Sequence, residues 1–208
     1  YKGRIALSRY TKLFSGTKRI SVVMLAFNHQ KKRPTSALQA ALSQYLRTYA
    51  EPEAKIACRA LDQGKIYQYC LGVPFFNERP ETLSALIEPH KNSDALLIAI
   101  VNQPDSTTKP SDENQRFFQS IDQQFTLIRS CENLRLYESP AKLQLLLIDR
   151  FTENRMLPEK EGVGLARKIA ADVAISLMQA QRVKCRWIFC TDADAVLPNE
   201  YFTASESH

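Results

Sequence analysis

Two acidic residues, separated by a single residue, are the sharpest chemical signal in this sequence. Asp192 and Asp194 directly follow the apolar run Trp187–Cys190 and precede Pro198. Such a run predicts a short buried strand, and open α/β sheets bind ligands at the carboxyl ends of their strands. In extended backbone, side chains at i and i+2 point the same way, so both carboxylates could face one site. Two oxygen ligands of this kind suit Mg²⁺ or Mn²⁺ held jointly with substrate phosphates. The alternative is a solvated acidic turn.

A second candidate site lies at the end of another predicted strand. In Val73–Glu78 (VPFFNE), the proline stops ladder pairing and turns the chain outward. The aromatic side chains of Phe75 and Phe76 could stack on a base, and Asn77 and Glu78 could form hydrogen bonds with a nucleoside. The alternative is an ordinary strand end followed by an acid that leads into a helix.

Several catalytic signatures are missing from the sequence. It contains no G-x-x-x-x-G-K-[ST], no H-E-x-x-H and no G-x-S-x-G. The segment Gly162–Arg167 (GVGLAR) begins like a dinucleotide fingerprint. An arginine stands where the third glycine belongs, and a polar loop precedes the segment, so we reject NAD binding there. The histidines His29, His90 and His208 are scattered, and we interpret each as a surface residue.

The elements that must position these residues alternate along the chain from residue 66 onward. The predicted strands are Tyr69–Phe76, Ala95–Val101, Leu143–Ile148 and Trp187–Cys190, all apolar on both faces. Three helices are predicted between them: one from Pro80, one after the N-cap Ser111 with Phe117, Ile121, Phe125 and Ile128 on one face, and one from about Gly164 to Gln181. In the last helix, Ala166, Ala170 and Ala174 are small enough for close approach to a sheet. This alternation predicts the α/β class, with an open, mostly parallel sheet flanked by helices.

The first 65 residues show a less regular pattern. We predict a buried strand at Ile20–Phe27, a helix at Pro34–Tyr49, and a second helix from Pro52 to a C-cap at Gly64. These elements could form an edge unit of the same sheet or a separate module.

Charge is distributed unevenly along the chain. Residues 1–70 carry 13 Lys/Arg and 3 Asp/Glu, whereas residues 71–208 carry 15 and 19. A basic first third fits contact with a membrane surface, a nucleic acid or a protein partner, and the alternative is a solvated basic face. No apolar run approaches the roughly 18 residues of a membrane span. The five cysteines form no C-x-x-C pair, which excludes a zinc finger and a disulfide scaffold and favours reduced thiols in the core.

Three motifs together resemble a known enzyme family. They are V-P-x-x-N-E (Val73–Glu78), E-G-V-G-L-A-R-K-I-A (Glu161–Ala170) and W-I-F-C-T-D-A-D-A-V-L-P (Trp187–Pro198). In order and spacing, over about residues 66–204, they resemble the nucleotide-sugar half of family 2 glycosyltransferases. The resemblance implies the Rossmann-like GT-A fold, a nucleotide-diphospho-sugar donor, Mn²⁺ or Mg²⁺, and transfer of the sugar to an acceptor with inversion.

The resemblance also implies roles for individual residues. Asp194 would contact the metal directly, and Asp192 would handle the ribose and share the metal. The turn formed by Pro74, Phe75, Asn77 and Glu78 would line the nucleoside. Arg167 would hold the base or a phosphate. Family members often carry acids after the second strand, where this chain has Asn102-Gln103-Pro104-Asp105, so base recognition is expected to use Asn102 or to work differently.

The resemblance divides the chain into a basic N-terminal extension or edge unit, residues 1–65, and a donor-binding half, residues 66–208. The sequence has no initiating methionine and stops soon after Asp194, so we expect a fragment truncated at the C-terminus. The acceptor half, which normally supplies the general base, is expected beyond His208, and the catalytic residue is therefore unknown. The acceptor would be a sugar or a lipid-linked molecule. We expect a cytoplasmic location, with peripheral contact at the inner membrane face through the basic region.

Two other functions fit parts of the sequence. Asp192–Leu197 also resembles the D-x-D-x-[TV]-L loop of haloacid-dehalogenase-like phosphatases, in which Asp192 would be the nucleophile and Asp194 the acid/base. That loop normally follows the first strand of its domain, whereas here at least four predicted strands precede it. Alternatively, the basic N-terminal third, with Lys31–Arg33 beside an apolar strand, could serve a non-enzymatic binding module. It lacks the aromatic and helix-turn-helix signatures of nucleic-acid binding.

Overall fold

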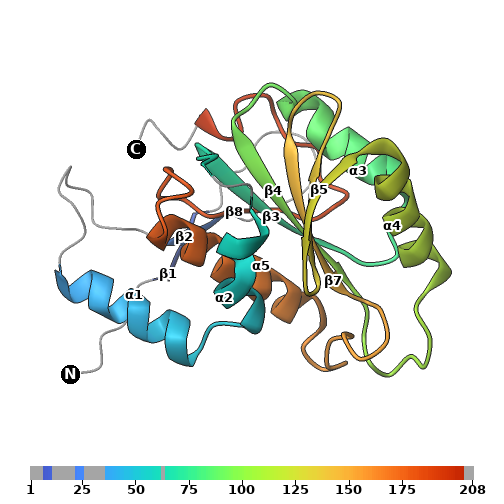
Figure 1. The fold of residues 1–208 in the computed structure, drawn as a ribbon, viewed down its shortest axis with the longest axis horizontal. Coiled ribbons are helices and arrows are strands. Elements are labelled where there is room, and N and C mark those ends of the chain that lie inside the picture. Colours follow the sequence, from blue (N-terminus) through green and yellow to red (C-terminus); the bar gives the residue numbers. More distant parts are fainter. Residues whose placement is uncertain (1–6, 11–21, 26–35, 62–63, 204–208) are drawn as a thin grey trace.

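The structure is a computed structural model that describes residues 7–10, 22–25, 36–61 and 64–203. Its centre is a six-stranded sheet with the strand order β5-β6-β7-β4-β3-β8 (Figure 1). The strands are β3 (Tyr69–Phe75), β4 (Ala95–Asn102), β5 (Thr126–Cys131), β6 (Leu134–Glu138), β7 (Gln144–Arg150) and β8 (Phe189–Cys190). Strands β7, β4, β3 and β8 are parallel, and β6 runs antiparallel to β5 and β7. The predicted α/β class and open, mostly parallel sheet are confirmed.

The order of the parallel strands creates a switch point in the sheet. The chain passes from β3 to β4 and then to β7 on one side, and returns to β8 on the other side of β3. The connection from β3 to β4 therefore runs toward one edge of the sheet, and the connection from β7 to β8 runs back toward the other edge. In open α/β sheets, the crevice at the carboxyl ends of such a strand pair is where ligands bind.

Helices cover both faces of the sheet (Figure 1). Helices α3 (Pro80–Ile87) and α4 (Asp112–Gln124) supply Leu83 and Phe117 to the core beneath one face. Helix α5 (Gly162–Gln179) packs on the other face, and α2 (Pro52–Ala60) and α1 (Ser36–Thr48) lie against α5. Side chains of each central strand alternate between these two cores, since successive residues of a strand face opposite sides.

Most predicted elements are found close to their expected bounds, but one helix was predicted too long. The hydroxyl of Ser111 accepts a hydrogen bond from the Asn114 N–H (3.1 Å), which confirms the N-cap of α4. This helix ends at Gln124, so Phe125 and Ile128 do not extend it. Ile128 instead belongs to β5, which forms an unpredicted hairpin with β6 around Glu132 and Asn133.

The ends of the predicted strand Ile20–Phe27 and the basic cluster Lys31–Arg33 lie outside the described residues. Strand β2 (Val22–Leu25) falls within the predicted strand and pairs antiparallel with β1 (Leu7–Tyr10) in a separate two-stranded sheet. Gly64 does not cap α2, because that helix already ends at Ala60 and Leu61 has extended backbone.

Helix α2 belongs to the same core as the large sheet. Its apolar face, Ile56, Ala57 and Ala60, is buried together with α5 and the central strands. Three of the five cysteines (Cys70, Cys185 and Cys190) are buried, as expected for core thiols. No helix in the described part of the chain combines the length and apolar character needed to cross a bilayer.

Candidate functional site

The candidate site lies at the switch point, where the carboxyl ends of β3 and β8 meet. Leu71 and Gly72 of β3 pair with Phe189 and Cys190 of β8. The ladder continues one step further, since the Thr191 N–H donates to the Gly72 carbonyl oxygen (3.2 Å). The residue that follows, Asp192, is therefore held beside the end of β3.

The two aspartates sit on a turn. The Ala195 N–H donates to the Asp192 carbonyl oxygen (3.2 Å), which places Ala193 and Asp194 at the corner of the turn. The predicted extended backbone is therefore wrong here, because β8 already ends at Cys190. The buried side chains of Ala193 and Leu197 anchor the turn in the core, and both carboxylates are exposed. They stand on the same turn at the sheet edge.

Arg167 reaches this turn from α5. Its Nη2 forms an ion pair with Oδ1 of Asp192, and both side chains are about half exposed, 41% and 53%. The structure thus brings together two residues that are 25 positions apart in the sequence, both of them predicted for the site. In this ion pair, each charge neutralises the other.

The first turn of α5 is open. The helix begins at Gly162, which has φ 39°, and its N-cap Glu161 makes no capping hydrogen bond through its side chain. A side chain at Gly164 would meet no atom within 4 Å, so this turn borders open space. Because α5 follows β7, its amino end lies at the carboxyl edge of the sheet. Uncapped helix N–H groups carry partial positive charge, and Arg167 lies just beyond them in the same helix.

The residues predicted at the end of β3 divide between core and surface. Pro74 is buried, and Phe75 is fully buried against Phe117, with ring centroids 4.7 Å apart. Phe75 is therefore unavailable for stacking on a base, which corrects the prediction for this residue. The neighbouring Phe76 is 46% exposed and is the aromatic that the edge presents.

Asn77 and Glu78 form hydrogen bonds with residues of the flanking helices α4 and α3 and of the α4 N-cap. Asn77 has φ 55°; its N–H donates to Asn114 Oδ1 (3.0 Å), and its Oδ1 accepts from the Ser111 hydroxyl (2.6 Å). Glu78 accepts a long hydrogen bond from Thr82 Oγ1 (3.5 Å). These contacts secure the chain reversal after β3 against the start of α4.

A row of buried polar atoms continues along the same edge. Asn102 ends β4 and is 4% exposed, and its Oδ1 has no hydrogen-bond partner among the described residues. Its register partner on β7 is Arg150, whose Nε lies 3.0 Å from Glu53 Oε1 in an ion pair. The other oxygen of Glu53 is buried without a hydrogen-bond partner in the described chain. Sequence reasoning missed Arg150 and Glu53, since an acid after a proline looks like any helix start.

Two other groups are unsuited to chemistry at this site. Burial raises the pKa of the Cys190 thiol to about 11, so it stays protonated at neutral pH beside the aspartate turn. His90 lies elsewhere, in the 3-10 turn η1 (Glu88–His90), and is 5% exposed. The interpretation of His90 as a surface residue is wrong, because Tyr201 and Phe202 pack against its ring.

The donor atoms at the turn fit a hard cation only in partnership with a ligand. Asp192 and Asp194 offer carboxylate oxygens, and no group of three or more His, Cys, Asp or Glu side chains that could hold a metal occurs in the described chain. Mg²⁺ commonly binds through one or two carboxylates and completes its shell with water and phosphate oxygens. The residues present match that arrangement and do not form a closed protein cage.

Comparison of the chain with protein-family models, with curated proteins and with solved structures finds no match.

Proposed function

We propose that this protein binds a nucleotide-diphospho-sugar at the switch point, as the donor-binding part of a glycosyltransferase with a GT-A-like fold. One observation carries the proposal: the Asp192–Ala195 turn, Arg167 and the open first turn of α5 occur together at the carboxyl edge beside β3. This edge offers both signs of charge within one site. A diphosphate bridged by a divalent cation needs both.

The proposed roles follow from the chemistry of each group. Arg167 and the first-turn N–H groups of α5 that follow Gly162 bind the diphosphate, since a guanidinium and a helix amino terminus both favour phosphate oxygens; the Gly162 N–H itself donates to the Pro158 carbonyl oxygen (3.2 Å). Asp194 and Asp192 would hold Mn²⁺ or Mg²⁺, with Asp192 also accepting hydrogen bonds from the ribose. The metal would neutralise charge on the diphosphate. Phe76 and Asn102 offer a stacking face and a hydrogen-bond acceptor for the base.

Binding exchanges one set of partners for another. The donor diphosphate would bind Arg167, and Asp192 would bind the ribose and help to hold the metal, so the Arg167–Asp192 ion pair would open. An exposed ion pair contributes only about 0–1 kcal/mol, so its loss opposes binding weakly.

The proposed reaction is an inverting displacement. An acceptor hydroxyl oxygen bonds to the anomeric carbon from the face opposite the diphosphate, while the bond from that carbon to the diphosphate oxygen breaks. The electron pair leaves with the diphosphate, and the hydroxyl proton passes to a general base. Charge develops on the leaving diphosphate, where Arg167 and the α5 amino end stabilise it. We assign no described residue as the base.

Calorimetric titration tests the proposal. UDP, GDP, ADP and CDP are titrated separately into the protein, each with and without Mn²⁺. At least one of them is expected to bind, and Mn²⁺ is expected to tighten that binding. Absence of binding by all four, in folded protein with Mn²⁺, would overturn the proposal.

A further inference from the structure

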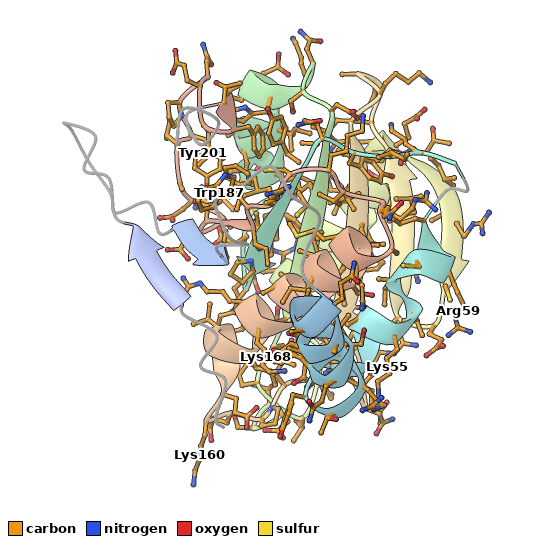
Figure 2. The ribbon with its side chains drawn as sticks, turned by 90° about the vertical axis from the view of Figure 1, so that its left-hand side faces the viewer. Lys55, Arg59, Lys160, Lys168, Trp187 and Tyr201 are labelled. Carbon is orange, nitrogen blue, oxygen red and sulfur yellow. The ribbon has the colours of Figure 1, made fainter. Side chains whose placement is uncertain are left out.

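A second charged surface lies away from the switch point, at the corner where α1 meets α2. We call it the basic corner and define it by Arg47, Tyr49, Lys55 and Arg59, all of which are exposed. Arg47 lies in the last turn of α1, and Lys55 and Arg59 follow the outer side of α2 (Figure 2). Tyr49, between the helices, is 64% exposed.

The acidic residues of these helices are turned inward. Glu53 is buried against Arg150, and Glu51 accepts a hydrogen bond from Lys168 Nζ (2.8 Å). Arg47 and Lys55 form no hydrogen bond or ion pair with any other residue that the structure describes. The outer surface of the corner therefore presents positive charge without an acid from either helix.

One exposed ion pair borders the corner. Arg59 pairs with Glu132 of the β5–β6 turn (2.9 Å), and both side chains are more than half exposed. Exposed pairs of this kind are weak, so Arg59 can exchange its partner at little cost.

The corner is held rigidly on α5. Lys168 Nζ donates to the Tyr49 carbonyl oxygen (2.9 Å) and to Asp172 Oδ2 (2.8 Å). Asp172, which is 1% exposed, also accepts from the Tyr45 hydroxyl (2.7 Å) and the Glu51 N–H (2.9 Å). These contacts pair the buried carboxylate of Asp172 with Lys168 and hold α1 and α2 in place against α5.

We infer that the basic corner is an interaction surface for an anionic membrane. Lys and Arg side chains near an anionic leaflet are attracted to it, and tyrosine is favoured at the level of the headgroups. The outward positions of α1 include Ala37, Ala40 and Ala41, which let the helix lie close to a flat surface. This inference is independent of the proposed donor site.

A membrane fits the corner better than a nucleic acid does. Recognition of single strands uses several aromatic faces along a basic groove, and the corner has one exposed aromatic, Tyr49. Its cations stand on two helices joined at a corner, without a single basic helix that could enter a major groove.

Vesicle co-sedimentation of the full chain tests the inference. The probes are vesicles of phosphatidylcholine alone and of phosphatidylcholine with phosphatidylserine in equal parts. We expect binding only to the anionic vesicles, with affinity falling as salt is raised. The double variant Arg47→Gln, Lys55→Gln should bind about 25-fold more weakly, since each cation near an anionic surface accounts for about fivefold.

A matched control makes the same charge change elsewhere. Lys109→Gln with Arg116→Gln removes two exposed cations from the loop before α4 and from α4 itself, on the opposite face of the sheet. This control should bind anionic vesicles like the parent chain. Equal binding to both kinds of vesicle, equal losses in the two double variants, or binding to single-stranded RNA with none to anionic vesicles would each overturn the inference.

Discussion

At the scale of single residues, the Arg167–Asp192 ion pair is the contact that the proposed ligand would have to replace. In the proposed function, Arg167 would bind the diphosphate and Asp192 the metal and the ribose, and the two side chains form an ion pair in this structure. The pair holds the Arg167 guanidinium at the turn that follows β8. Replacing either residue separates the contribution of the phosphate contacts from that of the metal.

Replacing Asp194 tests the metal assignment. In Asp194→Ala the turn loses a carboxylate that would be shared with the cation, so Mn²⁺-dependent affinity for a nucleoside diphosphate should fall by about tenfold or more, as for other charged contacts. Asp194→Asn keeps the shape but removes the charge, and should lose nearly as much. Both variants should fold, because the side chain is exposed. Calorimetric titration with and without Mn²⁺ measures the effect, and unchanged metal dependence in folded Asp194→Ala would contradict the assignment.

Replacing Arg167 tests the phosphate contact. Arg167→Gln should weaken nucleoside-diphosphate binding by roughly 10–100-fold, the range expected for a hydrogen-bonded charged contact. The loss should appear both with and without Mn²⁺, unlike that of Asp194→Ala. The urea midpoint should barely change, since the ion pair with Asp192 is exposed. A loss confined to the Mn²⁺ titration would show that Arg167 acts through the turn and does not contact phosphate.

The residue types at the site could be predicted from the sequence, but their surroundings could not. The place of Asp192 at a strand end was predictable because the apolar run before it indicates a buried strand. The burial of Phe75 depends on its register with the core face shared by Leu71 and Val73, and the sequence places two aromatics side by side. The pairing of Glu53 with Arg150 joins residues far apart in the chain and leaves no local pattern.

At the scale of elements, the spacing between β3 and α5 depends on one glycine. A Cβ at Gly72 would lie 2.8 Å from the Cβ of Ala170, closer than two carbon atoms can approach. The prediction that small residues of this helix approach the sheet is confirmed at this position. Gly72→Ala should therefore destabilise the fold by about 1–3 kcal/mol through overpacking. Urea unfolding measures this, and Ala170→Gly in the same chain should restore part of the loss.

The segment after the aspartate turn packs back over the sheet. Because it covers His90, the free energy of unfolding of the chain should depend on pH. Phe202 stacks on Tyr69 with ring centroids 5.0 Å apart and meets the His90 ring edge-on at 5.1 Å. His90 is buried and its Nε2 has no hydrogen-bond partner in the described chain, so burial lowers its pKa below the ordinary value. The unfolded chain then binds a proton more readily than the folded chain does, and the free energy of unfolding falls as pH drops through about 6.5.

The variant His90→Gln isolates this effect. It removes the titrating imidazole, so its free energy of unfolding should change less than that of the parent chain between about pH 7.5 and about pH 5.5, a range that brackets the ordinary histidine pKa. Urea unfolding at both pH values gives the difference. An identical pH dependence in the two proteins would show that His90 takes up a proton equally readily in the folded and the unfolded chain, and would contradict the prediction.

Elements with strong periodicity were predictable, and the hairpin was not. The apolar runs of β3, β4 and β7 are buried on both faces, which leaves a clear signal in the sequence. Strand β5 lies at the sheet edge and is mostly exposed. Its Ile128 continues the helical spacing of Phe117 and Ile121, so the helical period masked the start of the strand.

At the scale of the whole molecule, the candidate site is a product of strand order. No local pattern specifies that β8 adds beside β3 and not beside β7, because pairing is decided by contacts between distant segments. The predicted boundary at residue 65 faced the same difficulty. Composition changes near that position, yet α2 packs into the core shared by α5 and the central strands.

Two truncations distinguish the charge boundary from the packing boundary. Removing residues 1–35 leaves α1 and α2 in place, and the chain should still unfold cooperatively and bind a nucleoside diphosphate. Removing residues 1–65 also takes away Ile56 and Leu61, which are buried against α5. Full burial of each such side chain contributes about 1.5–3 kcal/mol, so the shorter chain should lose roughly 3 kcal/mol or more and expose the outer face of α5. Urea unfolding followed by circular dichroism compares the two. If both truncated chains unfolded at the same urea concentration, α2 would be a peripheral unit after all, and the charge boundary would coincide with the edge of the folded domain.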